Sequence, residues 1–399
     1  MDKKGRLIMR SDNPPAAHII SSEESGDTNE GVDPNQLIVN RRRGFLKTFG
    51  LAGAALSAGA LFSSRGPAKA ASGMSSGDVH ILRLLAAAEL IEADLWEQYA
   101  ELGGLTPGQL PVEADPTFKP MNSYQAAFMN LDSDGPQYIS SNALDEQSHA
   151  SFLNAYLASV GAEPVNLDEF RTLPSSKAKG AKQIGRLTNL MALNVDTSWY
   201  VRYRSTTNPD FGATFPQAVP SLSTGKFTAI PRDNADFTPK DHIQAIANTA
   251  AFHFGFIEQG GSSLYASMSQ KVTSAEVLRI TLGIGGDEIA HFLEWVDFSG
   301  NGVQPPIAPL TDPTNGLTFP NLDAIDAQGG VNPLFQTNLI FPVPCQFIHP
   351  KLPHCAVIRP IQITAQDAIN GFLQDGLFLG QSPLFLEKVL FLAKLADAA

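Results

Sequence analysis

The sequence predicts a mainly α-helical protein: a four-helix bundle with a long crossover between its second and third helices and an irregular C-terminal extension that ends in a helix. Four segments of about 25 to 30 residues repeat apolar residues at helical spacing, and matched lengths favour a bundle. The composition, 43% apolar and 17% charged among 399 residues, excludes a mostly disordered chain. Because 40 acidic residues outnumber 28 basic ones, we expect no nucleic-acid partner.

The four long helices have recognisable ends in the sequence. We expect them over roughly 75–103, 136–160, 239–268 and 273–300. Ser75 with Asp78, and Thr273 with Glu276, have the spacing of an N-terminal capping box. Pro136 suits the first turn of the second helix, because proline lacks the N–H that is unpaired there anyway. These signals fix the order and length of the helices.

The chain divides into three regions by composition. Residues 1–70 form a polar leader and signal, residues 71–299 the four-helix bundle, and residues 300–399 a Pro-rich extension. The crossover covers residues 161–237 of the bundle, and its part from Lys177 to Arg204 is a candidate fifth helix. The last helix is expected from Pro383 to Ala398.

The first 70 residues contain the parts of an export signal. Arg42-Arg43-Gly44-Phe45-Leu46-Lys47 precedes a weakly apolar stretch, and the small-x-small pattern Ala68-Lys69-Ala70 follows it. The hexapeptide resembles the twin-arginine motif, and the apolar stretch is short for a membrane span. We therefore expect a periplasmic or extracellular protein that is cleaved after Ala70 and whose partner during export is the twin-arginine machinery.

Two Glu-x-x-His pairs carry the chemical signal of the sequence. Glu146 with His149 lies on the second predicted helix, and Glu288 with His291 lies on the fourth. A spacing of three places the carboxylate and the imidazole on one face of a helix, one turn apart. One such pair would be weak evidence for a site. Two of them on helices of one bundle point to a shared metal centre.

The other two helices each offer a glutamate on their apolar stripe. On the third helix this is Glu258, and on the first it is Glu92, with Glu89 one turn before it. Carboxylates that face one another in an apolar core repel and are costly to desolvate unless they are neutralised. Two divalent cations supply that charge, and oxygen-rich ligation with imidazole suits iron or manganese.

This pattern resembles the bacterial ferritin-like superfamily, in particular the exported ferritin-like and desiccation-related proteins that are related to rubrerythrin and bacterioferritin. The resemblance covers Ser75 to Phe298. It implies a ligand set in which Glu92 and Glu258 are terminal, Glu146 and Glu288 bridge two metals, and His149 and His291 each bind one. Glu92 is preferred as the ligand from the first helix because Tyr99 follows it by seven residues, as a tyrosine does in the family. Glu89 remains the alternative ligand from this helix, because the aromatic residue Trp96 follows it at the same spacing.

The resemblance implies two iron ions, alternatively manganese, and a small-molecule oxidant, either oxygen or peroxide. The activities that it suggests are di-iron oxidation of Fe(II), peroxide removal as in a peroxidase, and a manganese-catalase-like reaction. The alternative is a non-catalytic stress-protection or metal-sequestering envelope protein, and a homodimer is kept open as the assembly. Two cysteines do not supply the second iron site of rubrerythrin, which needs two Cys-x-x-Cys pairs.

Several other residues are expected to lie outside the metal site. His80 and His242 fall in first helical turns, where solvent usually surrounds them, and His253 is expected to be hydrogen-bonded or exposed. Cys345 and Cys355 flank two histidines, but an oxidising compartment favours a disulfide between them over a metal site. Tyr99 and Tyr265 are interpreted either as neighbours of the metals or as core residues.

The export signal gives a direct prediction. Replacing Arg42 and Arg43 together with lysine keeps the charge of the leader but removes the paired arginines, so the protein should stay in the cytoplasm. Cell fractionation and immunoblotting measure this. A double variant that still reaches the periplasm would contradict the twin-arginine assignment.

Overall fold

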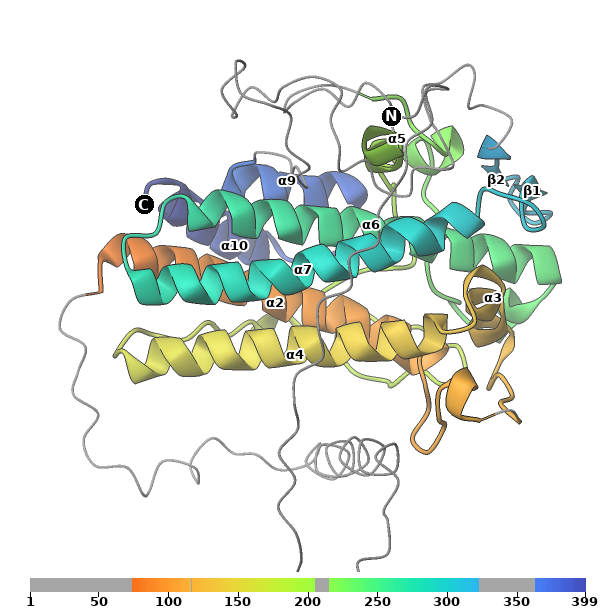
Figure 1. The fold of residues 1–399 in the computed structure, drawn as a ribbon, viewed down its shortest axis with the longest axis horizontal. Helices are drawn as coiled ribbons and strands as arrows, with labels where there is room; N and C mark the ends of the chain where they lie inside the picture. Colours follow the sequence, from red (N-terminus) through yellow and green to blue (C-terminus); the bar gives the residue numbers. More distant parts are fainter. Residues whose placement is uncertain (1–73, 116, 205–214, 323–362) are drawn as a thin grey trace, which may run out of the picture. The chain divides into compact units, whose positions relative to one another are not determined.

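The computed structural model describes residues 74–322 and 363–399, apart from residue 116 and residues 205–214 (Figure 1). This part of the chain is mainly α-helical. Its four long helices are α2 (Ser76–Gly103), α4 (Gly135–Ser159), α6 (Lys240–Ser269) and α7 (Ala275–Asn301). The shorter helices are α3 (Ser123–Leu131), α5 (Ser198–Arg204), α9 (Ala365–Asp375) and α10 (Pro383–Asp397). Strands β1 (Leu310–Thr311) and β2 (Thr318–Phe319) pair antiparallel.

The long helices pack in two pairs. The helix α2 lies along α4, and α6 lies along α7 (Figure 1). The two C-terminal helices cover these pairs on one side, because α10 packs on α2 and on α9, while α9 packs on α6. The apolar face of α10 thus finds its partner on α2, as its amphipathic sequence requires. Among the described residues, none of the helices combines the length and the apolar character of a membrane span.

The helix ends follow the signals in the sequence closely. The Ser75 hydroxyl caps α2 by accepting from the N–H of Asp78 at 3.0 Å. A proline stands in the first turn of α4, and Gly161 just beyond its end has a φ of +77°, which favours glycine. The cap of α7 differs slightly from the prediction: Ser274, not Thr273, accepts the N–H groups of the first turn. The four long helices are therefore confirmed.

The predicted fifth helix from Lys177 to Arg204 is wrong over most of its length, because only Ser198–Arg204 is helical. The physical reason is the carboxylate of Asp94 on α2. It accepts from the N–H groups of Leu187 and Thr188, both at 3.0 Å. Backbone N–H groups that bond to another element are not available to a helix, so this segment lies along α2 in an extended form.

The C-terminal region holds this extended segment from its other side. The N–H of Asn189 donates to the carbonyl of Leu377 at 2.7 Å, and the N–H of Asn194 donates to the carbonyl of Asp375 at 2.7 Å. The predicted terminal helix is confirmed as α10. The helix α9, which sequence reasoning missed, begins with a capping box of Thr364 and Asp367. The predicted disulfide partners and the export signal lie outside the described residues.

The buried charge of Asp94 gives a prediction about stability. Its carboxylate also pairs with Arg171 at 2.6 Å and is fully buried. Asp94→Asn removes the charge and turns an amide donor towards backbone donors, so the free energy of unfolding should fall by about 3–5 kcal/mol. Asp168→Asn is the control, because the 75% exposed Asp168 carboxylate pairs with the same arginine. It should cost less than about 1 kcal/mol in urea unfolding. Equal losses would contradict this account of the crossover.

Candidate metal centre

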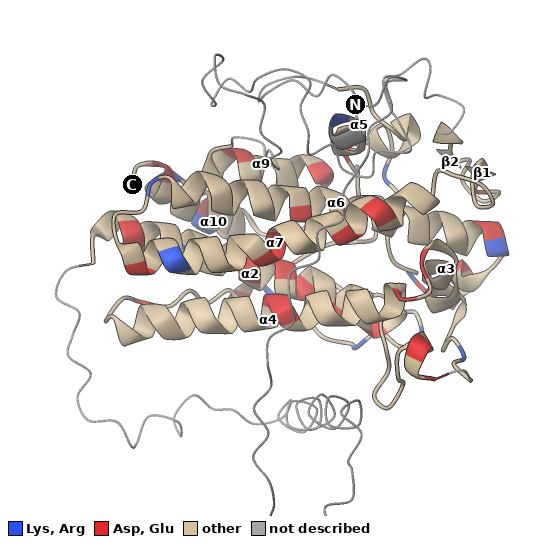
Figure 2. Cartoon of the chain, in the orientation of Figure 1, with Lys and Arg blue, Asp and Glu red and all other residues tan. Residues whose placement is uncertain are grey.

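All six residues that the sequence singles out are buried, and they come from the four long helices. Their exposed fractions are 3% for Glu92, 0% for Glu146, 8% for His149, 0% for Glu258, 0% for Glu288 and 5% for His291. Glu89, the alternative on α2, is 1% exposed. Figure 2 shows acidic residues midway along α4 and α7. Buried carboxylates in such number require charge partners.

The buried side chains form two adjacent groups. Glu89, Glu146, His149 and Glu288 each offer a ligand atom, and these atoms all lie within 4.8 Å of one another. Glu146, Glu258 and His291 form a second group by the same measure. Because Glu146 belongs to both groups, the two share a carboxylate. This arrangement is consistent with a site for two metal ions bridged by Glu146.

The two imidazoles approach opposite oxygens of Glu146. The Nδ1 atom of His149 lies 3.2 Å from Oε2 of Glu146 and 3.3 Å from Oε2 of Glu89. The Nδ1 atom of His291 lies 3.1 Å from Oε1 of Glu146 and 3.4 Å from Oε2 of Glu258. Each half of the cluster therefore contains one imidazole, one further carboxylate and one oxygen of Glu146.

An aspartate from the opposite helix lies behind each imidazole. The Nε2 atom of His149 on α4 lies 3.1 Å from Oδ2 of Asp287 on α7, and Nε2 of His291 on α7 lies 3.5 Å from Oδ2 of Asp145 on α4. Such partners orient a histidine and set which nitrogen faces a metal. Sequence reasoning missed both aspartates, although an Asp directly precedes the Glu of each Glu-x-x-His pair.

Two aromatic residues hold Glu89 and Glu258 reciprocally. The hydroxyl of Tyr265 on α6 donates to Oε1 of Glu89 on α2. In return, Nε1 of Trp96 on α2 donates to Oε1 of Glu258 on α6 at 3.0 Å. Each aromatic residue follows the glutamate of its own helix by seven positions. The two halves are thus related to each other, with Glu89 as the counterpart of Glu258.

This reciprocity bears on the choice between Glu89 and Glu92. Glu92 is in neither group of close ligand atoms, whereas Glu89 is in the first. Tyr99, whose spacing favoured Glu92, bonds with Nδ1 of His253 at 2.8 Å instead. The geometry therefore favours Glu89, the alternative that the sequence left open, as the ligand from α2. Glu92 lies beside the cluster, and its assignment as a ligand stays a prediction.

The cluster contains many buried polar atoms without a hydrogen-bond partner. They are Oε2 of Glu89, Oε1 of Glu146, Oε2 of Glu258, both carboxylate oxygens of Glu288 and both ring nitrogens of His291. Each such atom costs about 1–3 kcal/mol when it stays unpaired. Their convergence on one small volume fits a bound cation, because a metal ion would satisfy several of them at once.

The electrostatics of the cluster in the absence of metal depend on protons. Burial, together with Glu146, raises the pKa of Glu89 to about 8. Burial also raises the pKa values of Glu258 and Glu288. Burial acts on Glu146 in the same direction, but its close contacts with His149 and His291 outweigh the effect of burial and lower the pKa of Glu146 to about 2. The lowered pKa keeps Glu146 ionised, whereas the raised pKa values favour protons on Glu89 and Glu288.

Two histidines outside the centre are also buried. The expectation that His242 is solvated is wrong, because it is 2% exposed and lies between Asp236 at 3.1 Å and Asp312 at 2.7 Å. It joins the start of α6 to the loop that follows β1. His253 is confirmed as a satisfied histidine, since Nε2 lies 3.0 Å from Oδ2 of Asp375 and Nδ1 bonds with Tyr99.

Comparison with known proteins finds no protein-family model, no curated protein and no solved structure that matches this chain. The interpretation of the site therefore depends on its geometry. That geometry consists of a mainly helical fold and buried Glu/His groups that are suited to hold metal ions.

The raised pKa of Glu89 predicts how pH changes the stability of the metal-free protein. Between pH 4.5 and about 8 the folded protein holds a proton that the unfolded chain has lost. The free energy of unfolding should therefore fall by a few kcal/mol as pH rises through this window. Urea unfolding at pH 5 and pH 8 measures it.

The variant Glu89→Gln carries no titratable proton, so it should show a smaller fall than wild type. Glu387→Gln on the exposed face of α10 is the control and should behave as wild type. A metal-free protein that gains stability from pH 5 to pH 8 would contradict the claim that Glu89 holds a proton in the folded state.

Proposed function

We propose that α2, α4, α6 and α7 form a ferritin-like four-helix bundle that holds a dinuclear iron centre, alternatively manganese, and that oxidises Fe(II) or handles oxygen or peroxide. The observation that carries this proposal is the shared carboxylate of Glu146 between two Glu/His groups from the four helices. Two glutamates and two Glu-x-x-His pairs are the ligand set of dinuclear carboxylate bundles. The converging unpaired atoms support it independently.

The proposed ligands are Glu89, Glu146, His149, Glu258, Glu288 and His291. Glu146 bridges the two positions, and Glu288 is the second bridge because both its oxygens are buried and unpaired. Gly261 on α6 makes room for this second bridge. A Cβ atom at that position would lie 2.1 Å from Oε2 of Glu288, so any side chain would displace the carboxylate. Hard carboxylate oxygens with two imidazoles suit iron or manganese.

When bound, two such ions supply redox equivalents and Lewis acidity for oxygen or peroxide chemistry. The chain itself positions the donors. Asp287 accepts from Nε2 of His149, which leaves Nδ1 directed at the centre. Trp96 and Tyr265 hold the terminal glutamates Glu258 and Glu89 in fixed orientations. The apolar side chains of Trp96 and Phe254, both fully buried, surround the donors and lower the polarity of the site.

Charge balance supports binding of divalent cations over protons alone. Without metal, the cluster stores protons on its buried glutamates and on both imidazoles, since contacts with acids raise the pKa of His149 to about 12 against the effect of burial. Metal binding must release these protons, because ligands bind in their deprotonated forms. Two divalent cations then neutralise four carboxylates. Metal affinity should accordingly rise with pH.

We propose further that the protein works in the periplasm or outside the cell after twin-arginine export. This is supported by the Arg42-Arg43 motif, the weakly apolar stretch and the Ala68-Lys69-Ala70 pattern. Export through that route in a folded form would suit a protein that is loaded with metal before it crosses the membrane.

Loss of a bridging carboxylate tests the proposed function. Glu146→Ala and Glu288→Ala should reduce the metal content from about two ions per chain to one or none, because each carboxylate serves both positions. Elemental analysis of the purified protein measures this, with far-UV circular dichroism to confirm folding. Glu294→Ala is the control, since this acid also lies on α7 but accepts from the amide of Asn142 at 3.1 Å and belongs to neither group of close ligand atoms.

Equal metal content in wild type and Glu288→Ala would contradict the dinuclear centre. Addition of Fe(II) and oxygen, followed by the visible spectrum, then decides between the two functions. Turnover of Fe(II) or peroxide supports the oxidase. Bound metal without turnover supports the metal-sequestering alternative.

A further inference from the structure

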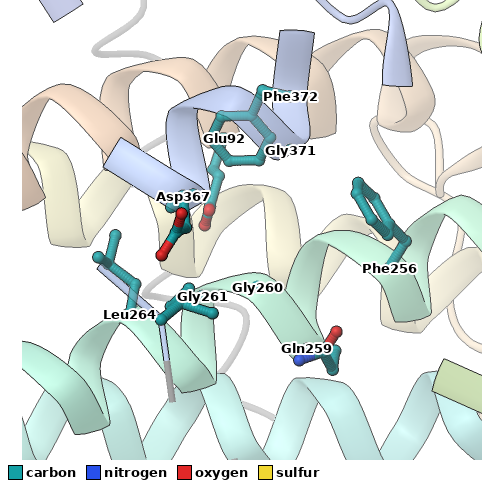
Figure 3. A pocket seen from close by; sticks show the side chains of 11 residues that line it. Glu92, Phe256, Gln259, Gly260, Gly261, Leu264, Asp367, Gly371 and Phe372 are labelled. Carbon is teal, nitrogen blue, oxygen red and sulfur yellow. The ribbon is translucent and has the colours of Figure 1, made fainter. Parts of the chain in front are cut away.

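A cavity of about 120 Å³ lies between α6 and α9 and reaches Glu92 on α2 (Figure 3). Its outer rim includes the exposed Asp367 of α9, and its inner end is Glu92, which is only 3% exposed. The cavity therefore connects the surface beside α9 with the buried interior beside the metal cluster. Sequence reasoning did not predict α9, and so it did not predict this cavity.

The wall of the cavity is mainly apolar. Phe256 and Leu264 of α6 face Ile363 and Phe372 from the C-terminal region across it. The polar lining residues are Glu92, Gln259 and Asp367. The amide nitrogen of Gln259 already donates to the hydroxyl of Ser263 at 3.0 Å, and Oδ2 of Asp367 accepts from Thr364 in the cap of α9. Most of the surface that a ligand would meet is therefore hydrocarbon.

Two glycines keep the cavity empty of side chains, and a third forms its inner wall. A Cβ atom at Gly260 would meet nothing within 4 Å, and one at Gly371 would meet only Cζ of Phe256 at 4.0 Å. The third glycine, Gly261, forms the inner wall next to the cluster. Its Cβ position lies 2.1 Å from Oε2 of Glu288 and 3.7 Å from Oε1 of Glu92. Only the bare backbone of Gly261 and the Glu92 carboxyl group thus separate the cavity from a proposed bridging ligand.

Size and polarity identify the kind of molecule that fits. A cavity needs about 10–15 Å³ to hold a water molecule, and an apolar cavity of about 150 Å³ binds benzene or xenon. Cations such as Ca²⁺ and Mg²⁺ need about six or more oxygen ligands, or waters in their place, and this mainly apolar wall does not offer them. A small uncharged apolar molecule fits both the volume and the lining.

We propose that this cavity is the site at which dioxygen binds on its way to the metal centre, with Glu92 and Gly261 as the inner wall past which it moves. This inference rests on the proposed function and goes beyond it, because it names dioxygen rather than peroxide as the oxidant. It also assigns helix α9 a role in the delivery of dioxygen. Glu92 is then a positioning residue of the access path and not a metal ligand. No bond changes in this step.

Xenon is the first probe, because it occupies apolar cavities of this size and needs no metal. Crystals of the metal-free protein under xenon pressure should show xenon between Phe256 and Phe372. Gly371→Leu should fill the cavity and remove the xenon. A leucine at a helical glycine is also favoured by helix propensity, so this variant should fold. Wild-type crystals with no xenon in the cavity would overturn the proposal.

The rate of Fe(II) oxidation is the second measurement. Gly371→Leu and Gly260→Leu should lower the rate with dioxygen about tenfold or more, which corresponds to about 1.4 kcal/mol at the barrier. Gly283→Leu is the matched control, since this glycine of α7 is exposed and its Cβ position meets nothing within 4 Å. Unchanged rates of Fe(II) oxidation in Gly371→Leu and Gly260→Leu would overturn the access path.

Hydrogen peroxide as the oxidant separates the two small molecules. Gly371→Leu and Gly260→Leu should retain a larger fraction of the wild-type rate with peroxide than with dioxygen, because the apolar wall favours the less polar molecule. An equal loss with both would overturn the choice of dioxygen. Metal content measured on the same samples separates this inference from the proposed function: a chain without metal contradicts both, whereas full metal with no xenon contradicts only the cavity.

Discussion

The energetic cost of burying acid groups around Glu146 is the constraint on which the arrangement of the four long helices depends. Five glutamates are at most 3% exposed in the interior of one mainly helical unit. Such a cluster is stable only if protons, imidazolium groups or metal ions neutralise it. The imidazoles of His149 and His291 do so for Glu146, and burial drives protons onto its neighbours. The same side chains that need neutralising present unpaired oxygens to one volume.

The surroundings of the cluster are explained by the need to hold these charges in place. Each helix pair contributes a glutamate, an aromatic residue seven positions later, and a Glu-x-x-His pair with a preceding aspartate. The aromatic residue and the aspartate both act on the opposite half, as Trp96 on Glu258 and Asp287 on His149 show. Each of these Glu and His side chains is therefore oriented by a helix other than its own. Rotation of either pair would disturb both halves of the centre at once.

The sequence predicted the parts of this account that depend on local spacing. Helix ends such as those of α2 are predicted by a capping residue at the start and by glycine at the end. The two Glu-x-x-His pairs are recognised directly from their spacing of three residues. Long-range hydrogen bonds decided the rest. The extended crossover depends on Asp94, which binds N–H groups more than 90 residues away. The choice of Glu89 over Glu92 depends on Tyr265 of another helix, because both glutamates share one stripe in the sequence.

Anomalous diffraction at the iron edge, on crystals of iron-loaded protein, tests the central claim most directly. The account predicts two anomalous peaks about 3.5–4 Å apart, one on each side of the Glu146 carboxylate, as in other two-metal sites. One peak should lie near Nδ1 of His149 and the other near Nδ1 of His291. The absence of peaks beside Glu146, or iron found only at surface acids, would contradict it.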